Sequence, residues 1–129
     1  MEIVNVEIFN PKPILFKKNG KTIAEIKKIP AMVNIILFQN DKLFSGMLAL
    51  GALPPAEMGA ALVSMYSEFQ EPIQKIIGLC IGQPPEFIEK EFGFYDVMMA
   101  LTAIISAIVE ETKFHSENKK KIEPVKPEA

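Results

Sequence analysis

The sequence contains one thiol and one imidazole, the two side chains most often paired for nucleophilic catalysis. Such a nucleophile would have to join Cys80 to His115. Cys80 recurs at helical spacing with Ile73, Ile76 and Ile77, which predicts a place in the core, and His115 falls near the end of the last predicted helix. We therefore interpret Cys80 as a core thiol and His115 as a surface histidine. No phosphate loop, G-x-S-x-G elbow or H-E-x-x-H pattern occurs, so we predict no catalytic residue and no enzymatic activity.

Carboxylates form two clusters that could serve acid–base chemistry or hold a divalent metal. One cluster is Glu86, Glu89 and Glu91, and the other is Glu110 and Glu111. A solvated helix face is the commoner origin of such clusters, and neither has the alternating ligands and glycine of a calcium loop. A single cysteine and a single histidine exclude an internal disulfide and a cysteine-built zinc site. We predict no metal and no cofactor.

The positive charges are all lysines and are concentrated near the start of the chain. The sequence has 14 Lys, no Arg and 16 acidic residues, for a net charge of −2; residues 1–53 carry +3 and residues 54–112 carry −7. A basic patch comprises Lys17, Lys18, Lys21, Lys27 and Lys28. Without arginine or interleaved aromatic residues, we predict no nucleic-acid partner. An acidic partner, the acidic body of this or another copy, and protection of an exposed strand edge remain alternatives.

Aromatic and methionine side chains concentrate late in the chain and could form a patch for an apolar partner. We expect most of them in the core, with those near Gly93 the best candidates for exposure. Together with Lys17, Lys18 and Lys21, the candidate partner-binding residues are Phe87, Phe92, Phe94, Tyr95, Met98 and Met99.

The elements that position these residues divide the chain into a β-rich start and a helical remainder. With 129 residues and 49% hydrophobic content, we predict a single domain over residues 1–115, with residues 1–28 rich in β-structure and residues 30–115 helical. Val4, Val6 and Ile8 alternate as in a strand.

Asn19-Gly20 predicts a hairpin in which Lys18 pairs with Lys21 and Phe16 pairs with Ile23. This register puts Phe16 and Ile23 on one face, and Leu15, Ala24 and Ile26 on the other.

Prolines, glycines and apolar periodicity predict five to six helices, so the fold class is mostly α, an α+β fold with the hairpin or small sheet packed on a helical bundle. We expect Pro30 to open the first helix, Asp41 to cap the second, and Gly82 to end a helix opened by Pro72. The expected helices are 31–38, 41–50, one opening at Pro55, 72–82, 85–91 and 94–115.

The last helix should be the long central core element, capped at Gly93 with Asp96 in its first turn. Its buried stripe should be Val97, Leu101, Ile104, Ile105 and Ile108. We expect the charged residues 116–129 to be disordered. The apolar run 97–109 is too short to span a bilayer and no secretory signal is evident, so we expect a cytoplasmic protein without a membrane partner.

The stretch from Ile76 to Glu86 is followed by an acidic connector, then by Phe94-Tyr95-Asp96-Val97 and a long apolar helix. This order of features resembles tail assembly chaperones of long-tailed bacteriophages and prophages. The hairpin with its Asn19-Gly20-Lys21 turn is similar too, so the resemblance covers about residues 14–115. Phe114 matches one of the aromatic residues that the family often has late in its last helix. Gly93 departs from the serine often found at the helix cap.

The resemblance implies a non-enzymatic protein of the host cytoplasm that binds the tape-measure protein and assists polymerisation of tail-tube subunits around it. It also implies a longer frameshifted product, for which Lys119-Lys120-Lys121 could encode the slippery site. A solubilising charged tail is the simpler explanation of these lysines. Alternatives are a structural phage tail or neck protein, a helical adaptor that forms homo-oligomers, and a small enzyme or ligand-binding domain.

Overall fold

The computed structural model describes residues 3 and 5–118, and its first regular element is a two-stranded antiparallel hairpin. Strand β1 spans Ile14–Lys18 and β2 spans Lys21–Ile26. Asn19 and Gly20 both have positive φ, 52° and 81°, as the predicted two-residue turn requires. The hairpin and the pairing of Lys18 with Lys21 are confirmed.

The predicted register beyond the turn is wrong by one residue. Phe16 pairs with Ala24 and Lys17 with Thr22, so Ile23 forms a bulge in β2. A bulge inserts one residue and exchanges the faces of all residues after it. Ile14, Phe16, Ala24 and Ile26 therefore share the face that packs on the helices, and Leu15 is exposed on the other.

The predicted strand around Val6 and Ile8 is not formed. Among the described residues no strand precedes Ile14, and residues 5–13 run extended without regular pairing. Two prolines, Pro11 and Pro13, separate this segment from β1 and interrupt any ladder, because proline has no backbone N–H to donate.

Two short helices follow the hairpin, and a 3₁₀ turn extends the second. Helix α1 spans Ala31–Gln39, α2 spans Asp41–Ala49, and the turn η1 spans Leu50–Ala52. Pro30 lies at the N-cap of α1, next to the helix it was predicted to open, and Asn40 rather than the predicted Asp41 lies at the N-cap of α2. The Asn40 side-chain amide donates to the Ile36 carbonyl at 2.8 Å and so also closes the end of α1.

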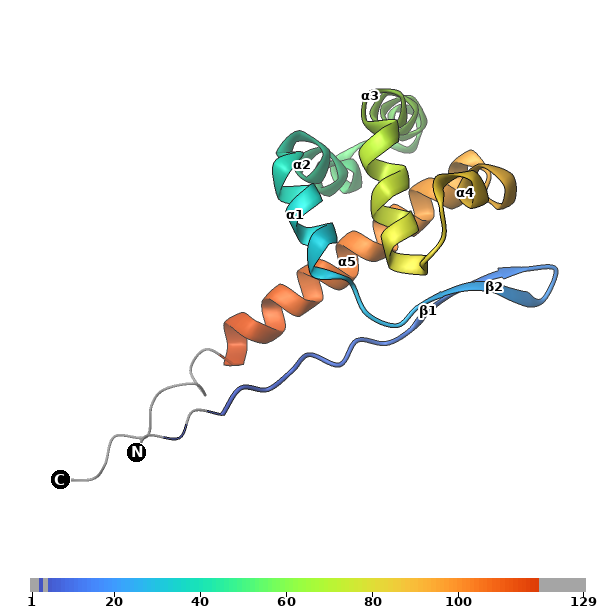
Figure 1. Cartoon of the computed structure of the whole chain (residues 1–129). Coiled ribbons are helices and arrows are strands. Elements are labelled where there is room, and N and C mark those ends of the chain that lie inside the picture. Colours follow the sequence, from blue (N-terminus) through green and yellow to red (C-terminus); the bar gives the residue numbers. More distant parts are fainter. Residues whose placement is uncertain (1–2, 4, 119–129) are drawn as a thin grey trace.

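The two helices predicted to open at Pro55 and Pro72 form one bent helix, α3, over Pro55–Ile81. Pro72 lacks the N–H that would bond to Glu68, and the backbone at Phe69 is non-helical, with φ −117° and ψ 27°. Figure 1 shows the two segments of α3 running in different directions. Gly82 ends α3 in the left-handed conformation, as predicted.

A short helix and the longest unbroken helix complete the described part of the chain. Helix α4 spans Pro85–Glu91 and α5 spans Phe94–Asn118. The backbone N–H of Gly93 donates to Asp96 Oδ2 at 2.8 Å, which is one of the two bonds of a capping box. Helix α5 continues three residues into the predicted tail, and residues 119–129 lie outside the described part.

The core forms where α5 crosses the second segment of α3, with α1, α2 and α4 around them (Figure 1). All five residues of the predicted α5 stripe are buried, and three isoleucines of α3 (Ile73, Ile76 and Ile77) have no exposed surface. The fold is therefore mostly α with an N-terminal hairpin and a long last helix at its centre, as the sequence predicts.

Replacing Ile104 by Asp tests this core directly. Ile104 is fully buried, so an unpaired carboxylate there should cost about 4 kcal/mol or more and unfold the protein. Met99, on the same helix but exposed, supplies the control. Thermal unfolding followed by circular dichroism should show native stability for Met99→Asp only. A cooperative, near-native transition for Ile104→Asp would contradict this core.

Candidate partner-binding surface

The thiol and the imidazole lie in different environments. Cys80 is buried in the last turns of α3, and this burial raises the pKa of its thiol to about 12. The His115 side chain is about half exposed near the end of α5, where its Nε2 lies 3.9 Å from Glu111 Oε1. A nucleophilic cysteine needs a lowered pKa, so the environment of Cys80 favours a packing role.

The acidic cluster on α4 is divided among different partners. Glu89 Oε1 accepts a hydrogen bond from Gln74 Nε2 at 3.3 Å, and Glu91 Oε2 pairs with Lys18 Nζ at 3.2 Å. The same Gln74 amide donates to the Tyr66 hydroxyl at 3.1 Å. Across the described part of the chain, no three His, Cys, Asp or Glu side chains gather closely enough to hold a metal ion.

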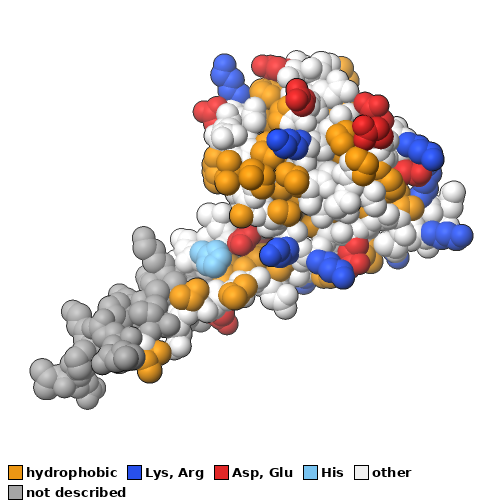
Figure 2. Space-filling view, viewed as in Figure 1, with side chains coloured by type: hydrophobic (Ala, Val, Ile, Leu, Met, Phe, Trp, Pro, Cys, Tyr) orange, Lys and Arg blue, Asp and Glu red, His pale blue; other side chains and the backbone are white. Residues whose placement is uncertain are grey.

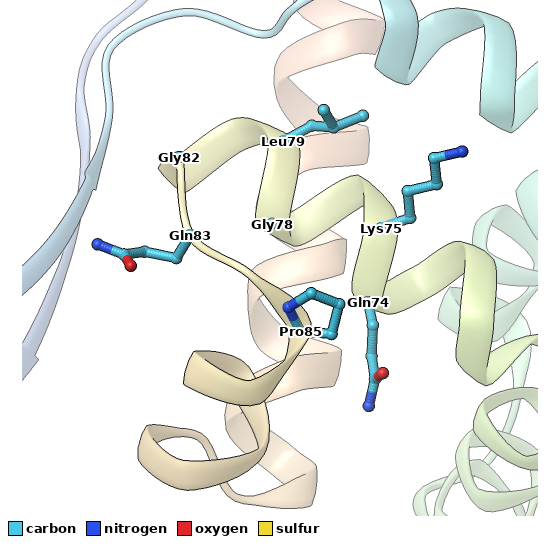
Figure 3. A pocket seen from close by; sticks show the side chains of 7 residues that line it. All are labelled: Gln74, Lys75, Gly78, Leu79, Gly82, Gln83 and Pro85. Carbon is cyan, nitrogen blue, oxygen red and sulfur yellow. The ribbon is translucent and has the colours of Figure 1, made fainter.

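A hollow of about 350 Å³ lies where α3 turns into α4. Its polar lining residues are Gln74, Lys75 and Gln83, and in Figure 3 their side chains point in three different directions. A ligand site needs polar groups that converge on one point, so this hollow lacks the geometry of a polar-ligand site.

The predicted partner-binding residues divide between the interior and the surface. Phe92 and Met98 are buried, Phe87 and Phe94 are partly buried, and Tyr95 and Met99 are exposed one turn apart on α5. Lys17, Lys18 and Lys21 are exposed on the hairpin.

Most of the late aromatic rings serve internal packing. The Phe92 ring lies 5.4 Å from Phe16, which joins the hairpin to the end of α4, and Phe94 lies 5.7 Å from Tyr66 of α3. Centroid distances of this size are typical of stabilising aromatic pairs. Among the predicted apolar residues, only Tyr95 and Met99 therefore offer large exposed side chains.

Among the described residues, an apolar surface without a partner lies on the two short helices, and it was not predicted. Helix α1 buries Val33, Ile36 and Leu37 on one side, and its other side leaves Met32, Ile35 and Phe38 about half or more exposed. We define the α1–α2 surface as Met32, Ile35, Phe38, Phe44 and Leu48.

Contacts and spacing make this surface continuous. The rings of Phe38 and Phe44 are 6.0 Å apart, and Leu48, 54% exposed, lies one turn beyond Phe44 on α2. Figure 2 shows hydrophobic side chains gathered over α1 and α2. The sequence does contain a signal for it, because residues 31–40 include no charged side chain. An uncharged helix with large apolar side chains on both sides is normally buried on both, and one side of this helix is not.

No protein-family model, no curated protein and no solved structure matches this chain. Within residues 3 and 5–118, no helix combines the length and apolar character that crossing a bilayer requires.

Two glycines of α3 make a matched test of the turn beside the hollow. A Cβ on Gly78 would lie 2.7 Å from the Gln83 carbonyl oxygen, whereas a Cβ on Gly59 would meet nothing within 4 Å. We expect Gly78→Ala to destabilise the protein by about 1–3 kcal/mol. Gly59→Ala should stabilise it by up to about 1 kcal/mol. Urea unfolding measures both, and equal effects would contradict the close approach of the chain at Gly78.

The raised pKa of Cys80 predicts a protected thiol. Because its pKa moves from 9.0 to about 12, the thiolate fraction at pH 8 should fall about a thousandfold. Alkylation should therefore be far slower in the native protein than in urea. Equal alkylation rates in the folded and unfolded protein would contradict the burial.

The unfolded Cys80 thiol ionises at lower pH than the folded one, so the free energy of unfolding should decrease as pH rises from about 9 to 12.

Proposed function

We propose that this chain is a non-enzymatic assembly chaperone that binds apolar helical segments of a partner through the α1–α2 surface. The observation that carries this proposal is an apolar face on a helix without any charged residue, left uncovered beside a well-packed core. Apolar surface of this kind on a soluble domain is typical of protein–protein contact sites.

The chemistry of the surface suits a partner of variable apolar sequence. Met32, Phe38 and Leu48 combine a flexible thioether, a flat ring and a branched aliphatic group. Side chains of this kind adapt to different apolar neighbours without directional bonds. An amphipathic helix lying across α1 and α2 would cover its own apolar face in the same way that helices occupy grooves in other complexes.

The resemblance to phage tail assembly chaperones supplies the particular partner. It rests on the helix that ends at Gly82 and on the capped start of α5, where the Gly93 N–H donates a hydrogen bond to Asp96. On this basis we propose that the partner is the tape-measure protein, whose long apolar helices need to be kept soluble while tail-tube subunits polymerise around them.

Co-expression with the tape-measure protein encoded in the same genome tests the proposal. The native chain should keep that protein soluble and co-purify with it. Ile35→Ser combined with Phe38→Ser should reduce the soluble fraction at least about tenfold, because two exposed anchors of the contact are lost. Met99→Ser, which removes an exposed apolar side chain from α5, should leave solubilisation unchanged.

Three outcomes would contradict the proposal. They are a source genome without a tape-measure gene, equal solubilisation by the Ile35→Ser/Phe38→Ser variant, and stoichiometric amounts of the chain in purified particles. The last outcome would favour a structural tail or neck protein, because a chaperone leaves before the particle is complete.

A further inference from the structure

The segment before the hairpin has the pattern of a strand but no strand to pair with. Within residues 5–13, Val6 and Ile8 alternate with Asn5 and Glu7, and their side chains are 69% and 85% exposed. We call residues 5–8 the N-terminal arm. Apolar residues at a spacing of two are the mark of a strand with one covered face, and the arm lacks that cover.

The arm is directed away from its own hairpin. The ring of Phe9, which follows the arm, lies 5.3 Å from the ring of Phe114 near the end of α5. Figure 1 shows the described residues of this first segment extending away from the hairpin. Pairing of the arm with β1 of the same copy would require this aromatic contact to break.

Strand β1 offers a free edge of the matching kind. In the described part of the chain the sheet has two strands, so β1 has β2 on one side only. In a hairpin closed by Lys18 and Lys21, the backbone N–H and C=O groups of Leu15 and Lys17 point away from β2. An exposed edge of this kind is a template for another strand.

A hollow of about 420 Å³ runs along this edge. Its walls are made mainly by β1 and by the junction of α4 and α5. Phe16 and Phe92 line it, together with the ion pair of Lys18 with Glu91. The aromatic part of these walls matches the apolar side chains at every second position of the arm.

The charges of the arm and the hairpin are opposite. Glu2 and Glu7 are the only charged residues before Lys12, and the hairpin carries Lys17, Lys18 and Lys21 against one acid, Glu25. With Val6 and Ile8 turned toward Phe16, Glu7 faces the other side of the sheet, which is the side of Lys17. Lys17 forms no ion pair among the described residues.

We propose that the N-terminal arm of one copy adds as a third strand to the β1 edge of a second copy. Val6 and Ile8 cover the hollow beside Phe16 and Phe92, Glu7 pairs with Lys17, and backbone hydrogen bonds join the arm to β1. This self-association involves neither the α1–α2 surface nor a tape-measure protein, so it stands independently of the proposed function.

A reciprocal charge exchange tests the pairing. E7K and K17E should each self-associate at least about tenfold more weakly than the native chain, because each places like charges opposite one another. An equimolar mixture should regain native association, since arm and hairpin are again complementary in both directions. Sedimentation velocity over a concentration series measures all four samples.

The apolar part of the contact has its own variant and control. Val6→Ser combined with Ile8→Ser should also weaken self-association at least about tenfold, and circular dichroism should remain native because both side chains are exposed. Val63→Ser, an exposed apolar change on α3, should associate like the native chain. A native chain that stays monomeric, an arm variant that associates normally, or a mixture that fails to recover would each overturn the proposal.

Discussion

The break in α3 is the constraint on which the arrangement of the other helices depends. Pro72 removes one backbone hydrogen bond, and the non-helical conformation of Phe69 turns the helix three residues earlier. The Gln74 amide spans this break to Tyr66 and also reaches Glu89 of α4, so the angle is held by hydrogen bonds as well as by sterics. One segment of α3 can therefore meet α2, where a Cβ on Gly46 would touch Met65, while the other packs on α5.

Features fixed by a few neighbouring residues could be predicted from the sequence. The Asn19-Gly20 turn requires positive φ at both positions, and Gly82 ends α3 for the same local reason. The α5 stripe followed from periodicity, because an amphipathic helix of this length has only one face to bury. The continuity of α3 through Pro72 could not be predicted, because it depends on packing and on the distant Gln74 contacts, which compensate for the lost bond.

The candidate surface was missed for a related reason. Hydrophobic pattern shows which side of an amphipathic helix is buried, but α1 has large apolar side chains on both sides, so its pattern does not distinguish the covered side from the open one. The late aromatic residues lie mostly in the interior, as expected. Phe92 and Phe94 have the composition of an interface, yet they pack against Phe16 and Tyr66, partners that lie far away in sequence.

The two proposed contacts rely on different physics, and this difference lets them operate together. Strand addition at β1 is directional, because backbone hydrogen bonds and the Glu7–Lys17 pair fix one register. Contact at the α1–α2 surface is non-directional and tolerates a changing apolar sequence. Copies joined through their arms would each keep an uncovered α1–α2 surface, because that surface lies on other elements. A long partner with several apolar segments would then be held by several surfaces at once, and weak individual contacts would add to tight binding.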